Sequence, residues 1–192
     1  MRQLYFFIVL LLLLSACGSS GAANDKLDKK ALFGTWETDD LYKNAAFNIQ
    51  VEFDKNWKVQ RPRFKSLFGG DLFEATYLPS VHEMPINITM TVDQKNPFKK
   101  VSVLEELQES LDGYEMLFDE DEMIKSPISK TKIAGEEYAY FKLTFPDDGD
   151  SSYVTEYYRY SKGYYISIIS YYNPTADEPV ALDFIANIKR LK

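Results

Sequence analysis

Cys17 is the only cysteine in the 192-residue chain, and it follows Leu14, Ser15 and Ala16 at the end of an apolar run. A cysteine thiolate is a nucleophile that can be alkylated. With no second cysteine, no intramolecular disulfide can form, so the folded part must be held together by its core. These four residues therefore indicate modification of one thiol, at the boundary between an apolar segment and the rest of the chain.

The segment before Cys17 has the layout of an export signal. Arg2 is the only charge before the unbroken apolar stretch from Leu4 to Leu14. A basic start, a short apolar core and small residues at the end are typical of secretory signal peptides. The apolar stretch has 11 residues, whereas a membrane-spanning helix needs about 20. The stretch is thus too short to be a comfortable anchor by itself.

Leu14-Ser15-Ala16-Cys17 resembles the lipobox of bacterial lipoproteins at every position. The resemblance implies that residues 1–16 are a lipoprotein signal peptide, removed before Cys17, and that the Cys17 thiol receives a diacylglyceryl group. Acylation of the new amine would add a fatty acid such as palmitate, and two or more chains anchor stably. We therefore expect a lipid-anchored protein on the extracytoplasmic face of a cell membrane. A buried cysteine beside a plain signal peptide is the alternative.

His82 is the only histidine, and it lies in a loop bounded by Pro79 and Pro85. A Ser-His-Asp triad would have to use it, and the sequence has no Gly-x-Ser-x-Gly nucleophile pattern. A single histidine also excludes a histidine-rich metal site. We interpret His82 as a surface or structural residue.

Two acidic clusters have residue types that bind cations or transfer protons. Asp147, Asp148 and Asp150 lie at a turn, but they lack the glycine-then-glutamate register of a Ca²⁺ loop. Residues 119–122 are interpreted as a solvated acidic loop. Paired carboxylates for glycoside hydrolysis depend on their separation in space, and the sequence singles out no pair. We predict no metal, no cofactor and no catalytic residue.

The net charge of −7 argues against a nucleic-acid partner, because nucleic acids select basic surfaces. The densest basic patch contains Lys58, Arg61, Arg63 and Lys65. Facing anionic lipid headgroups, each such charge would contribute about 1 kcal/mol. The alternative is a hairpin loop balanced by nearby acids.

Tyrosines are the best indication of a binding surface. Eight of them lie between Tyr153 and Tyr172, and tyrosine supplies rigid, amphipathic contact area at interfaces. By strand alternation, roughly half should pack under a helix and the others should be exposed. We take Tyr153, Tyr157, Tyr165 and Tyr171 as candidate residues for binding a protein or a sugar. Ordinary cross-strand packing is the alternative.

Alternation of apolar and polar residues predicts the strands that position these side chains. A short first strand is expected at Phe33–Glu37, and Trp57 begins a return strand. The other expected strands are Phe47–Phe53, Leu72–Leu78, Ile86–Val92, segments within Ile124–Ile133, and Ala139–Phe145.

Tyr153–Tyr160 and Tyr164–Tyr172 are expected to form a hairpin around Ser161-Lys162-Gly163. A three-residue loop with glycine in a left-handed conformation would pair Tyr160 with Tyr164.

Two helices are expected. Ser102 and Glu105 have capping-box spacing, and Gly113 suits a helix end, which predicts a helix over about Val103–Asp112. A second helix should begin near Pro179 and continue along an apolar stripe to Leu191. Its final basic residues would then lie at the negative end of the helix dipole.

Residues 18–30 show neither alternation nor a helical apolar face, which is typical of a flexible tether. We therefore divide the chain into a signal peptide (1–16), a lipidated cysteine with its tether (17–30) and one domain (31–192). The order strands, helix, strands, helix predicts an α+β domain, an antiparallel sheet with helices packed on it.

The order of elements resembles the PsbP-like fold over about Trp36 to Leu191. The resemblance is carried by Tyr42-x-Asn44, the strand 47–53, Trp57, the central helix, the turn at Gly135 and the last helix. It implies an α/β/α sandwich. The family includes photosystem assembly factors, nuclear-transport regulators and bacterial lipoproteins, so it implies binding or assembly more than catalysis. No family site residue can be matched here, and a fold does not fix a function.

The leading hypothesis is a non-catalytic lipoprotein that binds a protein or an envelope component. One alternative is an envelope hydrolase using carboxylates, which would need a deep cleft with convergent acidic side chains. Another is a small-ligand carrier, which would need an enclosed apolar cavity.

Overall fold

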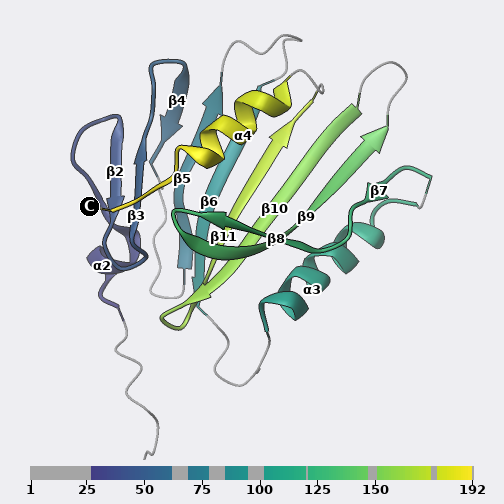
Figure 1. Cartoon of the computed structure of the whole chain (residues 1–192), viewed down its shortest axis with the longest axis horizontal. Coiled ribbons are helices and arrows are strands. Elements are labelled where there is room, and N and C mark those ends of the chain that lie inside the picture. The colour runs from purple at the N-terminus through teal and green to yellow at the C-terminus, as the bar shows by residue number, and fades with distance from the viewer. Residues whose placement is uncertain are drawn as a thin grey trace, which may run out of the picture.

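The computed structural model describes residues 27–61, 69–77, 85–94, 102–119, 121–146, 151–173 and 177–191. These residues form two antiparallel sheets with three helices (Figure 1). The predicted α+β class, an antiparallel sheet with helices packed on it, is confirmed. Several residues discussed above lie outside the described part of the chain: residues 1–26 with Cys17, Arg63, Lys65, His82, Glu120 and residues 147–150.

The larger sheet combines strands from the middle and the end of the sequence. Its strands follow one another in space as β4 (Trp57–Gln60), β5 (Gly69–Tyr77), β6 (Ile86–Gln94), β11 (Tyr164–Tyr172), β10 (Ser151–Ser161), β9 (Glu136–Pro146) and β7 (Ile124–Lys125). A further strand, β8 (Ser129–Ile133), also pairs with β9. β7 and β8 thus share one edge of β9. Between them the Ser126 backbone N–H donates to the Lys142 carbonyl at 2.8 Å.

The smaller sheet joins the beginning of the described chain to its end. Its order is β1 (Thr35–Trp36), β2 (Leu41–Asn44), β3 (Ile49–Glu52) and β12 (Lys189–Arg190). All of its pairings are antiparallel, with Lys189 opposite Gln50 and Arg190 opposite Ile49.

The predicted first strand at Phe33–Glu37 is wrong in its first part, because Phe33 ends a short helix, α2 (Lys29–Phe33). The Asp28 carboxylate caps this helix by accepting from the Ala31 backbone N–H at 2.6 Å. Gly34 follows with φ 63°, where a side chain would clash with the Lys43 carbonyl. Only Thr35 and Trp36 are extended. The last two residues assigned to the tether are helical.

Both faces of the larger sheet are covered. The main core includes Ile88 of β6, Ile168 of β11 and Phe184 of α4 (Glu178–Ala186). The second core lies between the opposite face of β9 and β10 and α3 (Val103–Glu115), which contributes Leu107 and Leu111. We call the two sides the α4 face and the α3 face. Figure 1 shows α4 lying across the sheet and α3 near its β9 side.

The predicted capping box of α3 is confirmed. The Ser102 hydroxyl accepts from the Glu105 backbone N–H at 3.2 Å, and the Glu105 carboxylate accepts from the Ser102 backbone N–H at 2.6 Å. The predicted end at Asp112 is wrong, because the helix continues through Gly113 to Glu115. Glycine lowers helix stability without ending a helix whose apolar side packs on a sheet.

The predicted last helix is too long. α4 ends at Ala186, and Lys189 and Arg190 then form β12 against β3. Ile188 is buried in the main core between the two elements. The basic residues near the end of the chain therefore complete a sheet instead of complementing a helix dipole.

The predicted register of the β10–β11 hairpin is wrong by one residue. Ser161 pairs with Tyr164 and Tyr160 with Tyr165, so the loop contains only Lys162 and Gly163. Both loop residues have positive φ, 52° and 88°, as the type I′ turn of a two-residue hairpin requires.

None of the described helices is both long and apolar enough to span a membrane.

Candidate functional site

The four candidate tyrosines do not converge on one surface. Strand alternation places Tyr153 and Tyr157 on the α4 face, whereas Tyr165 and Tyr171 lie on the α3 face. Tyr157 and Tyr165 are buried, and Tyr153 and Tyr171 are half-buried. A joint binding role for these four residues stays a prediction, because no contact described here tests it.

Tyrosines on the α4 face hold α4 against the sheet. The Tyr153 ring stacks on Tyr172 with centroids 5.2 Å apart, and the Lys142 ammonium lies 4.3 Å from the Tyr153 ring centre. Lys142 also pairs with Glu178 of α4 at 2.7 Å, and the Tyr172 hydroxyl donates to the same carboxylate at 3.1 Å. These contacts are packing between layers.

A buried carboxylate connects α3 to β10. Glu156 is 2% exposed and accepts hydrogen bonds from the Ser110 hydroxyl at 2.7 Å and the Tyr114 hydroxyl at 2.8 Å. Burial and then the nearby Glu156 charge raise the pKa of Tyr114. Both Glu156 oxygens accept from α3 hydroxyls, so this group positions the helix.

Metal ligation gains no support from the described residues, among which no group of three or more His, Cys, Asp or Glu side chains could hold an ion. An open hollow of about 560 Å³ lies beside α2, lined by residues that include Leu27, Ala46 and Leu191.

An exposed apolar surface lies where α3 ends. Met116 is 81% exposed, Leu117 76% and Phe118 37%. We call these three residues, which lie between α3 and β7 in the sequence, the α3–β7 patch. Ile124 of β7 is also 60% exposed, but it lies on the α4 face, because it pairs with Thr144 and Thr144 pairs with Tyr153. Other large exposed apolar side chains, such as Leu104 and Leu182, come from the start of α3 and from α4. Apolar side chains left in water at one place on a surface are a feature of interaction sites.

The turn after α3 is ordered by its own hydrogen bonds, and it fixes the α3–β7 patch in place. The backbone N–H of Phe118 donates to the Tyr114 carbonyl at 3.0 Å, and that of Glu122 donates to the Asp119 carbonyl at 3.0 Å. The Glu122 carboxylate accepts from the Asp119 backbone N–H at 3.1 Å. The Phe118 ring packs edge-on against the Phe145 ring, with the two ring centroids 4.8 Å apart. This contact joins the patch to the second core.

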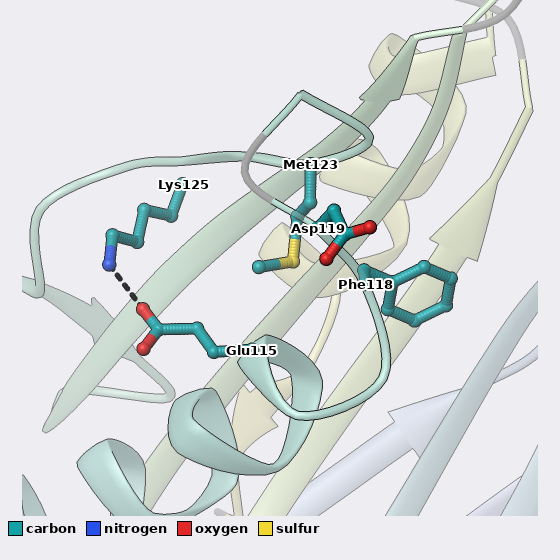
Figure 2. A pocket seen from close by; sticks show the side chains of 5 residues that line it. All are labelled: Glu115, Phe118, Asp119, Met123 and Lys125. Atoms are coloured by element: carbon teal, nitrogen blue, oxygen red, sulfur yellow. Dashed lines mark hydrogen bonds and ion pairs between the residues drawn. The ribbon is translucent and has the colours of Figure 1, made fainter.

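A pocket of about 460 Å³ opens at this turn. Figure 2 shows the five residues that line it: Glu115, Phe118, Asp119, Met123 and Lys125. Glu115 and Lys125 form an ion pair on one side, and Asp119 and Phe118 lie on the other. Met123 is 6% exposed and belongs to the second core. The pocket therefore combines an apolar wall with carboxylates.

The surroundings of the α3–β7 patch are acidic. Glu115, Asp119, Asp121 and Glu122 are all exposed. The last turn of α3 carries no basic residue, although the negative end of a helix dipole favours cations. Negative charge from side chains and from the helix end thus accumulates around the exposed apolar residues.

A short apolar run in the sequence indicates this site, although the prediction followed the tyrosines instead. Asp119, Asp121 and Glu122 are exposed, as predicted for a solvated loop. Met116-Leu117-Phe118 immediately before them is a run of three apolar residues just after the buried face of α3 has ended. Such a run on a surface is unfavourable unless it has a function.

No protein-family model and no curated protein matches the chain. Among solved structures, it is similar to LpqN, a Mycobacterium tuberculosis protein involved in cell envelope biogenesis. The two are 14% identical with a TM-score of 0.44, over 74% of this chain and 79% of LpqN. The chain is also similar to a cyanobacterial PsbP from Synechocystis, at 10% identity and a TM-score of 0.48, over 88% and 94% of the two chains.

A third similar structure comes from Bacteroides thetaiotaomicron, at 14% identity and a TM-score of 0.46. The match covers 80% of this chain and 48% of that one, so the chain corresponds to about half of that protein. A PsbP is thus among the structures to which this chain is similar.

Proposed function

We propose that the chain is a lipid-anchored, non-catalytic binding module on the extracytoplasmic face of a membrane, and that it contacts a protein partner through the α3–β7 patch. The observation that carries this proposal is the exposure of Met116, Leu117 and Phe118 in one run directly after α3. Soluble proteins seldom leave apolar side chains together in water, and where they do, the surface often binds another molecule.

Two further features support the proposal. The patch is built on a hydrogen-bonded turn, so a partner would meet a surface that is already ordered, which lowers the entropic cost of binding. The exposed carboxylates around it would be repelled by anionic lipid headgroups, so the surface suits a protein better than a bilayer.

The resemblance of Leu14–Cys17 to a lipobox supports the anchor. The described part of the chain begins at Leu27, ten residues after Cys17. Ten residues reach at most about 35 Å when fully extended. An anchor at Cys17 would therefore keep the start of the domain within about this distance of the membrane, and the domain within reach of partners there.

Site-specific crosslinking in intact cells tests the binding role. A photoreactive residue at position 117 of the full-length protein is expected to give a discrete adduct, and the same residue at Lys55, in the exposed turn before β4, is expected to give none. Phe118→Ser should remove the adduct from position 117. The binding role is wrong if position 117 gives no adduct in a chain present at its normal level.

Labelling with a fatty-acid probe tests the anchor separately. Cys17→Ala is expected to abolish labelling, because the thiol is the nucleophile that the lipidation needs. Ser15→Gly, which keeps the thiol and a small residue before it, serves as the control and should retain the label. Labelling of the Cys17→Ala chain would contradict the anchor and leave the crosslinking result unaffected.

A further inference from the structure

The α3–β7 patch has a charge pattern that defines its partner more narrowly. Four exposed carboxylates surround it, from Glu115, Asp119, Asp121 and Glu122. Lys125 is the only cation among the residues that line the pocket, and it already pairs with Glu115 (Figure 2). The positive charge within the pocket is thus smaller than the negative charge on its walls and rim.

The end of α3 adds to this imbalance. The first turn of the helix contains Glu105 and Glu106, which suit its positive end. The last turn contains no basic residue, and Glu115 lies there instead. The helix's own side chains therefore complement its dipole at the beginning and not at the end, where Lys125 of β7 is the cation that lines the pocket. A cation brought by a partner would meet the carboxylates and the helix end at the same place.

We propose that the α3–β7 patch binds a cationic amphipathic segment of a partner protein, an inference that rests on the proposed function. Apolar side chains of that segment cover Met116 and Leu117, and a Lys or Arg side chain enters the pocket beside Asp119. The pocket volume of about 460 Å³ is within the range of pockets that hold ligand groups. Such a segment satisfies the apolar and the acidic part of the site together.

Two other occupants fit less well. A second copy of this chain would carry the same net charge of −7, so long-range repulsion opposes self-association. An anionic bilayer would be repelled by the same carboxylates that attract a basic peptide. Both are outcomes that the experiment below separates from the proposal.

The test uses the lipidated full-length chain in phosphatidylcholine vesicles and a fluorescein-labelled peptide made of Leu and Lys in a helical amphipathic pattern. A second peptide replaces every Lys with Glu, and a third replaces every Leu with Ser. Fluorescence anisotropy, corrected with protein-free vesicles, measures binding. Only the Leu/Lys peptide is expected to bind, and raising the salt from about 0.15 M to about 1 M should weaken its binding severalfold.

Matched variants identify the surface. Leu117→Ser should lower the affinity at least about tenfold, because central apolar contacts carry much of the binding energy. Asp119→Asn combined with Glu122→Gln should lower it about threefold to tenfold and should reduce its dependence on salt. Leu182→Ser and Asp183→Asn, exposed positions on α4, serve as controls and should leave the affinity unchanged. Urea unfolding checks that all variants remain folded.

The inference is overturned if the Glu peptide binds as well as the Lys peptide, or if the double acid variant keeps its affinity and salt dependence. It is also overturned if sedimentation shows a dimer that Leu117→Ser dissociates, since a second copy would then occupy the patch. An adduct from position 117 in cells together with charge-independent peptide binding would leave the proposed function standing without this inference. No adduct from position 117 would remove the proposed function itself.

Discussion

Buried tyrosines make the stability of this protein depend on pH in the alkaline range. Tyr138 and Tyr157 are 1% and 5% exposed, and burial raises the pKa of each to about 12 from an ordinary value of 10.0. The Arg159 guanidinium opposes the rise at Tyr138 without cancelling it. Both phenols are therefore expected to keep their protons in the native state well above the pH at which an unfolded chain releases them.

The free energy of unfolding is expected to fall between about pH 10 and about pH 12. Below pH 10 both states keep the phenol protons and the stability is at its full value. Above pH 10 only the unfolded chain releases these protons, which lowers the free energy of unfolding by up to about 1.4 kcal/mol per pH unit for each tyrosine. Urea unfolding at a series of pH values measures the slope. Tyr157→Phe should reduce the slope, and an unchanged slope in that variant would contradict the prediction.

The helix α3 contains a residue that lowers its stability. Gly113 lies inside the helix with no positive φ, and a Cβ built there meets no atom within 4 Å. Gly113→Ala is therefore expected to raise the free energy of unfolding by about 0.5–1 kcal/mol. Thermal or urea unfolding measures the change. Gly34→Ala, where φ is 63°, should instead destabilise the protein, and stabilisation by both changes would contradict this account.

The sequence predicted elements best where the determining interactions are local. The α3 capping box needs only Ser102 and Glu105, three residues apart, and it formed as predicted. The alternating strands β6 and β9 were predicted for the same reason, since each carries its own apolar pattern.

Elements decided by distant partners were predicted less well. Ile188 is buried in the main core, and its spacing in the sequence is equally compatible with a longer last helix. Lys189 and Arg190 are extended because they pair with β3, which lies far away in the sequence. The β10–β11 turn was difficult for another reason. Lys162 adopts a positive φ that its side chain does not favour, so its residue type does not indicate a two-residue loop.

The candidate site was hard to predict because alternation assigns residues to faces without showing what covers a face. β10 and β11 are covered on both sides, so alternation alone could not show which tyrosines are exposed. The exposed residues lie instead at Met116–Phe118, where the helical pattern has just ended.

Arg159 joins the two sheets of the protein. It lies on β10 of the larger sheet, is 7% exposed, and donates to the Phe47 carbonyl, which precedes β3 of the smaller sheet, at 2.6 Å. Its guanidinium also lies 5.3 Å from the Tyr138 ring centre and 3.5 Å from the Glu136 carboxylate. One side chain thus contributes contacts to both sheets.

Arg159→Met is expected to lower the free energy of unfolding by about 1–3 kcal/mol, because the buried Phe47 carbonyl loses its charged donor. Urea unfolding measures the change. Arg190→Met, at an exposed position of β12, is the control and should change stability by about 0.5 kcal/mol or less. Equal effects of the two substitutions would contradict the joining role of Arg159.

The pairing of β12 with β3 also has a consequence for when this protein can fold. Residues 49 and 50 of β3 pair with residues 190 and 189 of β12. The two strands of this pair are therefore separated by most of the described chain. Contacts between such distant residues form slowly, because the loop between them must be ordered first. A chain synthesised from its N-terminus cannot complete this sheet until Arg190 has emerged. In the proposed exported chain, this late closure would favour an open chain during transit and folding after arrival.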